Sequence, residues 1–265
     1  MFGKLLKHEL RSSAPLMLIL NGVALFCGFL GMIAMKIISS DIFYMNYTDN
    51  VIWIVLPCML LFYAAYIGLI VCFAASQYIQ LFRFYGSRFT DRGYLTFTLP
   101  ISAHTNFLSA AVNILIWTLV SYVVFFFSIN LFLIGGMSEE LFSVSATATV
   151  EDVPWGMVLA MLFVLSVSPV YSVVVNMTAV VTACSLFKRM KVLGCIGFMY
   201  ALSMVFGILI AAIMLFCMIH PMVAGNDPMP TMTFGYALMG VVMAFASVGG
   251  YFLSVHLMKK KLNLS

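Results

Sequence analysis

Residues 192–219 read VLGCIGFMYALSMVFGILIAAIMLFCMI, an almost wholly apolar run without one charged side chain. An α-helix needs roughly 20 such residues to cross a hydrocarbon core ~30 Å thick, whereas a buried helix of a water-soluble protein is shorter and apolar on one side only. This run therefore predicts a membrane-spanning helix.

Comparable runs recur along the chain and predict six spans, at about 14–38, 51–80, 107–134, 155–187, 192–219 and 232–257. Backbone polar groups within hydrocarbon must be paired inside their own segment, so spans of this length are helices; the strands of a membrane barrel have ~10 residues that alternate in polarity. With 64% apolar and only 8% charged residues, the chain of 265 residues lacks the polar surface of a soluble globule. We expect an all-α integral membrane protein with six transmembrane helices.

The charged residues orient these spans. All lysines and arginines except Lys36 fall on one side of the predicted membrane, and all acids except Glu9 and Asp91 fall on the other. Short loops rich in Lys and Arg remain in the cytoplasm, so both termini are predicted to be cytoplasmic. No soluble domain or internal repeat interrupts the pattern, and residues 1–265 are expected to form a single transmembrane domain.

Several kinds of chemistry find no support in the sequence. No Asp, Glu, Lys, Arg or His lies centrally in a predicted span, where an ion-coupled pump usually needs an ionisable group. Neither an H-E-x-x-H motif, nor a Gly-rich phosphate loop with Lys, nor a Ser, His and Asp set at membrane depth is present. The four histidines are too scattered to form a metal-ligand cluster. We predict that the chain is not an enzyme, binds no cofactor or metal itself and has no nucleic-acid partner.

The N-terminus is predicted to form an amphipathic helix over residues 1–13, lying at the membrane interface. Its apolar residues Phe2, Leu5, Leu6 and Leu10 share one face of a helix, and Lys4, Lys7 and Arg11 point elsewhere. A simple positive anchor for the first span explains the charges equally well but leaves the apolar spacing unexplained.

The loop between the second and third spans, residues 83–102, reads RFYGSRFTDRGYLTFTLPIS. It is too long for a tight turn and too rich in aromatic residues for a flexible linker, so we expect it to fold against a partner. The lipid surface is one such partner, and a cytoplasmic protein with an apolar groove is the other. Composition does not decide between them.

Within this loop, residues 91–102 (DRGYLTFTLPIS) are preceded by two spans and an N-terminal segment KLLKHELR at 4–11. This arrangement resembles the membrane subunits of Gram-positive ABC transporters of the type-2 exporter class. The resemblance covers the whole chain in layout and rests in detail on these two cytoplasmic segments. It implies a six-helix permease in the bacterial cell membrane that forms a homodimer and docks on a separate ATP-binding subunit, which holds ATP and Mg²⁺.

The resemblance also assigns roles to residues. Carried onto this sequence, the ATPase-coupling residues are Asp91, Arg92, Gly93, Tyr94, Leu95, Phe97, Leu99 and Pro100, and the interfacial helix docks through Phe2, Lys4, Leu5, Leu6, Lys7, Leu10 and Arg11.

Polar residues inside the fourth predicted span are candidates for lining a substrate path. Ser168, Ser172 and Asn176 recur at four-residue spacing, and Thr178 and Thr182 form a second stripe. The alternative is that each of them makes an interhelical hydrogen bond, as Ser, Thr and Asn commonly do in membrane bundles.

These features together predict the transmembrane subunit of an ATP-driven ABC exporter that moves a hydrophobic or amphipathic substrate, because a passage without fixed charges suits lipophilic cargo better than ions or sugars. Some members of the resembling family export amphipathic toxin peptides or confer resistance to antimicrobial peptides, which favours a peptide. The alternative is a non-transporting membrane immunity or sensor protein that binds a peptide or partner.

Overall fold

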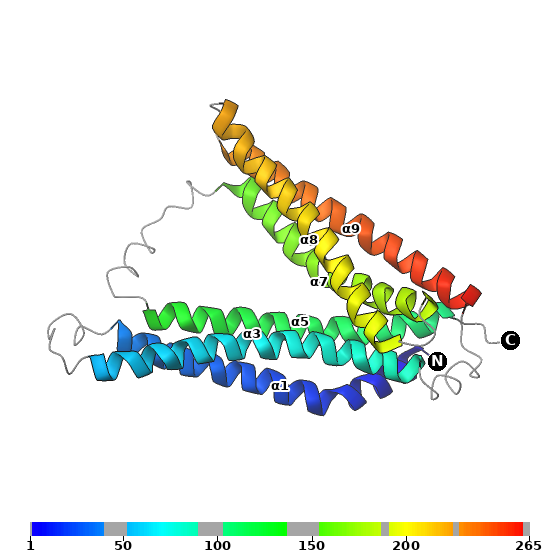
Figure 1. The fold of residues 1–265 in the computed structure, drawn as a ribbon, viewed down its shortest axis with the longest axis horizontal. Coiled ribbons are helices and arrows are strands. Elements are labelled where there is room, and N and C mark those ends of the chain that lie inside the picture. Colours follow the sequence, from blue (N-terminus) through cyan, green and yellow to red (C-terminus); the bar gives the residue numbers. More distant parts are fainter. Residues whose placement is uncertain are drawn as a thin grey trace. The chain divides into compact units, whose positions relative to one another are not determined.

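The computed structural model describes residues 2–39, 52–89, 103–136, 154–186, 191–224 and 228–261. In this part of the chain the secondary structure is helical throughout and contains no strand (Figure 1). The helices are α1 (Phe2–Ile38), α3 (Ile52–Arg88), α5 (Ala103–Gly136), α7 (Trp155–Leu186), α8 (Lys191–Ala224) and α9 (Pro228–Lys261). Each contains one predicted span, so the prediction of six long apolar helices is confirmed.

All six helices are long and apolar enough to cross a membrane. The shortest, α7, has 32 residues, and at 1.5 Å per residue its length of about 48 Å exceeds a ~30 Å hydrocarbon core. Large apolar side chains face outward, among them Phe245, Val123 and Leu193 with 75%, 69% and 69% of their surface exposed. Because water would penalise such a surface and lipid would not, the helices fit a multi-pass membrane protein.

The second helix differs most from its predicted boundary. It was expected to end near residue 80, with a loop from Arg83, but α3 continues to Arg88. The physical reason is burial at helical spacing, because Leu81, Phe84 and Arg88 are all at most 6% exposed. The prediction that the inner loop begins at Arg83 is therefore wrong. The following helix begins at Ala103, slightly before the predicted residue 107.

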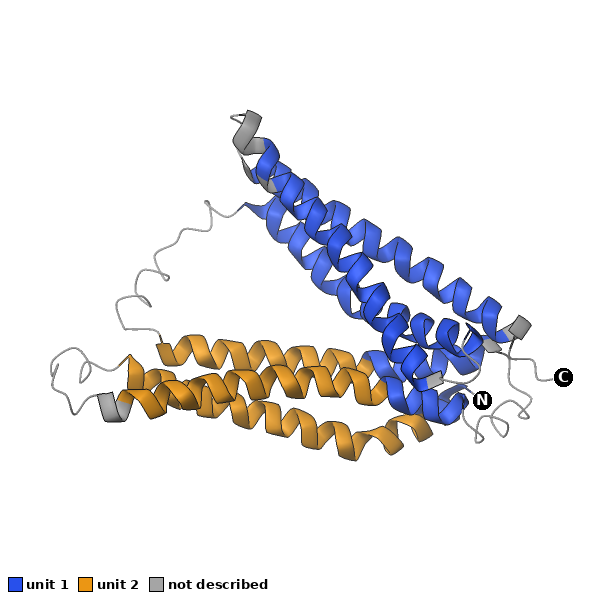
Figure 2. Ribbon diagram, in the orientation of Figure 1, with its two compact units in different colours: residues 1–6, 81–115, 151–265 blue, residues 7–80, 116–150 orange. Residues whose placement is uncertain are grey.

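One compact unit comprises residues 7–80 and 116–150 (Figure 2). Here α1 packs closely on α5 through small residues: a Cβ added at Gly28 would lie 2.8 Å from the side chain of Ser128, and one at Gly31 would overlap the ring of Phe132. Ser128 Oγ donates a hydrogen bond to the carbonyl of Ala24 at 3.4 Å. This contact fixes the face that α1 buries, a stripe formed by Ser13, Met17, Asn21, Ala24, Gly28, Gly31 and Ala34.

The other compact unit comprises residues 1–6, 81–115 and 151–265 (Figure 2). It contains α7, α8 and α9 together with the last turns of α3 and the first turns of α5. Its core surrounds α7, in which residues 173–183 are nearly all buried, with Met177, Val180 and Val181 at most 1% exposed. A Cβ on Gly240 of α9 would overlap the ring of Phe163 of α7, so these two helices approach closely. Whether the whole chain acts as one transmembrane domain stays a prediction.

The N-terminal residues are helical but are not set apart from the first span. Residues 2–38 form the single helix α1, with Pro15 inside it and no break near residue 13. Lys4, Lys7 and Arg11 are exposed, and the apolar residues Phe2, Leu5, Leu6 and Leu10 are half-buried. The amphipathic interfacial helix stays a prediction.

Candidate functional site at the ends of α3 and α5

The predicted coupling segment lies between the end of α3 and the start of α5. Its residues, from Asp91 to Pro100, fall outside the described part of the chain. The two helix ends that flank this segment are described, and both belong to the unit that contains α7 and α9. Their contacts show how this end of the bundle is held.

A buried arginine joins the two helix ends. Arg88 Nε donates to Asn106 Oδ1 at 3.0 Å, and Arg88 Nη2 donates to the Asn106 carbonyl at 3.1 Å. Nη1 donates to Ser87 Oγ at 3.2 Å, and the guanidinium carbon lies 5.0 Å from the centroid of the Phe84 ring. Arg88 is 6% and Asn106 8% exposed. These buried, charge-assisted hydrogen bonds and the cation–π contact join the end of α3 to the start of α5. We call this pair the Arg88–Asn106 clamp.

Aromatic side chains surround this Arg88–Asn106 clamp. The Phe84 ring meets Phe89 and Phe107 edge-on, with centroids 5.7 and 6.4 Å away. Phe107, which is fully buried, in turn meets Tyr251 of α9 edge-on at 5.6 Å. These edge-to-face pairs add to the burial of the rings and extend the contact from α3 and α5 to α9.

A hydrogen bond ties the start of α5 directly to α9. His104 Nδ1 lies 3.3 Å from the hydroxyl oxygen of Tyr251. His104 is the second residue of α5, so this bond forms at the end of the helix where the predicted coupling segment stops. The clamp and this bond together connect both ends of the segment to three helices, α3, α5 and α9.

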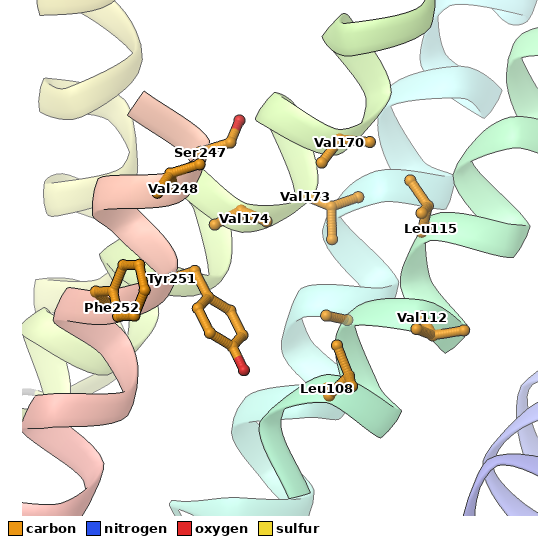
Figure 3. A pocket seen from close by; sticks show the side chains of 11 residues that line it. Leu108, Val112, Leu115, Val170, Val173, Val174, Ser247, Val248, Tyr251 and Phe252 are labelled. Carbon is orange, nitrogen blue, oxygen red and sulfur yellow. The ribbon is translucent and has the colours of Figure 1, made fainter. Parts of the chain in front are cut away.

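Beside this cluster lies a pocket between α5, α7 and α9 (Figure 3). Its volume is about 380 Å³. The pocket is almost entirely apolar; α5 contributes Leu108, Ala111, Val112 and Leu115, α7 contributes Val170, Val173 and Val174, and α9 contributes Ser247, Val248, Tyr251 and Phe252. Tyr251 belongs both to this wall and to the aromatic cluster, so the pocket and the clamp are neighbours in one unit.

Most of the candidate path-lining residues in α7 bond to their own helix. Ser168 and Ser172 are half-buried and donate to the carbonyls of Leu165 and Pro169. Thr182, which is buried, donates to the carbonyls of Thr178 and Ala179. Asn176 is half-buried.

Thr178 makes the interhelical contacts among these residues. Its single hydroxyl proton has two acceptors within reach, the carbonyl of Val174 in its own helix at 2.7 Å and the carbonyl of Gly250 in α9 at 3.1 Å. Its oxygen accepts a hydrogen bond from Ser254 of α9 at 2.9 Å. A Cβ on Gly250 would lie 2.9 Å from this same hydroxyl oxygen, so glycine permits the approach. The contacts of Thr178 are those of helix packing, and a role in lining a path stays a prediction for all five residues.

A second set of polar residues, which the sequence analysis did not single out, lies in the unit that contains α1. Gln77 of α3 accepts a hydrogen bond from Thr118 of α5, Oγ1 to Oε1, at 3.0 Å. Gln80, one turn further on, is 2% exposed, and neither of its amide atoms has a hydrogen-bond partner among the described residues. Ser121 Oγ shares this property. Two glutamines near the end of an apolar run were the signal that could have drawn attention to this place.

Among the described residues, no three His, Cys, Asp or Glu side chains gather as metal ligands would. No protein-family model, no curated protein and no solved structure matches the chain. The resemblance to exporter permeases therefore stays a prediction that rests on the sequence segments quoted for it.

Proposed function

We propose that this chain is the transmembrane subunit of an ATP-driven ABC exporter for a hydrophobic or amphipathic substrate, with a peptide as the favoured class. In this proposal it lies in the bacterial cell membrane with both termini in the cytoplasm, and it works as a homodimer with a separate ATP-binding subunit that carries ATP and Mg²⁺. Residues 91–102 are the segment that docks on that subunit.

The observation that carries the proposal is the buried clamp at the base of this segment. A loop that only connects two spans needs no buried guanidinium, because each buried charge costs free energy unless it is fully hydrogen-bonded. A segment that transmits force needs firm ends, since a loosely held loop would absorb the motion of its partner. The Arg88–Asn106 bonds and the His104–Tyr251 bond supply such ends and pass displacement into α3, α5 and α9.

The surfaces of the helices support the substrate class. Large apolar side chains face outward from the helices, and a path along such surfaces suits lipophilic cargo. The predicted absence of ionisable groups from the middle of the spans favours an energy source outside this chain, which the ATP-binding subunit would provide.

Co-purification tests the docking step. The chain is expressed with the ATP-binding protein encoded beside it, where one is present, and Leu95, Phe97 and Leu99 are replaced together by Asp. The wild-type chain is expected to retain the ATPase through purification, and the triple variant is expected to lose it because three charges cannot enter an apolar groove. The matched control replaces Leu141, Phe142 and Val144 by Asp, three apolar residues in a loop predicted to face the opposite side of the membrane.

Retention of the ATPase by the Leu95, Phe97 and Leu99 variant would show that residues 91–102 are not the docking segment. Failure of the wild-type chain to bind any ATP-binding subunit would contradict the exporter proposal and favour the non-transporting immunity or sensor protein.

A further inference from the structure

The pocket between α5, α7 and α9 has an almost wholly apolar wall, in which only Tyr251 and Ser247 carry a polar side-chain atom (Figure 3). The hydroxyl of Tyr251 is bonded to His104, at the start of α5. From there Leu108, Val112 and Leu115 follow along α5, and the seven steps from residue 108 to residue 115 rise about 10 Å. The other polar lining group, Ser247 Oγ, donates to the carbonyl of Met243 in its own helix at 2.7 Å.

This arrangement excludes an extended peptide backbone as the occupant. Each residue of such a backbone brings an amide donor and a carbonyl acceptor, and within hydrocarbon each needs a partner. Among its lining residues the wall offers two hydroxyls, Tyr251 and Ser247, and Ser247 can only accept because its proton is donated to Met243. Two such groups cannot satisfy the donors and acceptors of an extended backbone. An unbranched hydrocarbon chain has no hydrogen-bonding groups, so it can lie against an apolar wall without leaving a donor or acceptor unpaired.

The rim of the pocket is formed by exposed apolar side chains. Val248 and Phe252 of α9 are 56% and 64% exposed, and Leu108 of α5 is 43% exposed, although all three also line the pocket. The outer surface of these helices is apolar and fits contact with lipid. The pocket is therefore continuous with a surface that meets hydrocarbon. A volume of about 380 Å³ lies toward the small end of ligand sites and suits one chain rather than a whole lipid.

We propose that this pocket binds one acyl chain of a bilayer phospholipid, with the lipid's polar part beside His104 and Tyr251 and the chain extending toward Leu115. The driving force is packing. Hydrocarbon inside the pocket is no more apolar than hydrocarbon outside, but an unfilled pocket forfeits the dispersion contacts of its wall. The proposal does not rest on the exporter function, since a chain that transports nothing would hold the same lipid.

Photo-crosslinking in vesicles tests the proposal. The chain is reconstituted into phosphatidylglycerol vesicles that contain a small fraction of phospholipid with a diazirine midway along one acyl chain, and the adducts are located by mass spectrometry. We expect adducts concentrated on residues 108–115 and 247–252, above the level on outward-facing residues of α8 such as Leu193 and Ile208, which report lipid in general contact.

Two variants make the test specific. Val112→Phe fills the pocket and is expected to lose the adducts on both stretches while those on α8 remain. Val123→Phe is the matched control, because Val123 lies on the same helix, outside the pocket, and is 69% exposed; its adducts are expected to match those of the wild type. Leu115→Ala enlarges the far end, and it is expected to keep the adducts and to raise those from a probe whose diazirine stands at the chain terminus.

Labelling in proportion to exposure alone, or a wild-type pattern in Val112→Phe, would overturn the proposal. It would also be overturned if an amphipathic peptide with a photoactivatable side chain labelled the pocket and the phospholipid did not. Because no ATP-binding subunit is present in these vesicles, the outcome is separate from that of the docking experiment.

Discussion

The Arg88–Asn106 clamp makes a quantitative prediction about stability. Arg88→Met keeps most of the side-chain length but removes three hydrogen bonds and the contact with the Phe84 ring. Asn106→Ala removes the side-chain amide that accepts from Nε, while the backbone carbonyl of residue 106 stays in place for Nη2.

The magnitudes follow from these contacts. A hydrogen bond to a charged group contributes about 1.5–3 kcal/mol in soluble proteins, whereas interhelical hydrogen bonds in a membrane protein average about 0.6 kcal/mol and reach about 1.7. Both side chains are buried at the end of a span, and we therefore expect about 1–2 kcal/mol for Asn106→Ala. Arg88→Met also leaves the amide oxygen of Asn106 without this donor, so about 2–4 kcal/mol is expected.

A double-mutant cycle isolates the pair. Unfolding of the four proteins is followed by tryptophan fluorescence during titration with dodecyl sulfate in mixed micelles. The double variant is expected to lose about 1–2 kcal/mol less than the sum of the single losses, because the bond can be lost only once. Arg11→Met, at an exposed position on α1, serves as the control and should change the unfolding free energy by less than about 0.5 kcal/mol. A coupling energy within about 0.3 kcal/mol of zero would refute the clamp.

Three further predictions concern the helix contacts. Gly31→Ala should destabilise the chain by about 1–3 kcal/mol, because the added Cβ would overlap an aromatic ring of α5. Gly22→Ala on the same helix has no atom within 4 Å of the added Cβ, so it should be neutral or stabilising by up to about 1 kcal/mol. Equal effects of the two substitutions in the dodecyl sulfate titration would contradict the packing of α1 on α5. Thr178→Val should cost about 0.6–2 kcal/mol by removing its bonds to α9. Thr233→Val, whose hydroxyl donates to the carbonyl of Met229 in its own helix, should cost less than about 0.5 kcal/mol, and a smaller loss at Thr178 than at Thr233 would argue against the interhelical bonds. Gln80→Leu should leave the unfolding free energy unchanged or raised, because it removes a buried amide that has no hydrogen-bond partner among the described residues. A loss of more than about 1 kcal/mol would mean that this amide is hydrogen-bonded.

The sequence was sufficient for the six helices because their signal is local. An apolar run such as residues 192–219 admits one structure in a membrane, and its length alone distinguishes a span from a strand. The predicted end of α3 was wrong for an equally local reason. Arg83, Gly86 and Arg88 read as the start of a loop, but their neighbours Leu81 and Phe84 are buried, and burial carried the helix to Arg88.

The contacts at the candidate site could not be predicted from local sequence patterns, because they join residues that are distant in the sequence. Arg88 was interpreted as a charge that orients the chain and as part of the loop that folds against a partner. Nothing in the sequence pairs it with Asn106, which lies 18 positions away across the predicted segment. The pocket depends on the rotation of three helices about their axes, which brings Val112, Val173 and Tyr251 to one space. Apolar spans give little sign of such rotation, because most of their faces are equally apolar.

In the proposed exporter, residues 91–102 would couple this membrane chain to ATP hydrolysis through the clamp. Its most direct test is the rate of ATP hydrolysis by the partner subunit co-reconstituted in lipid vesicles with the wild-type chain or with Arg88→Met, each titrated with amphipathic peptides. We predict that peptides raise the rate with the wild-type chain, and that the Arg88→Met complex stays assembled but no longer responds to them. Equal stimulation in both complexes would contradict the coupling role of the clamp, and a rate that does not depend on the membrane chain at all would contradict the exporter function.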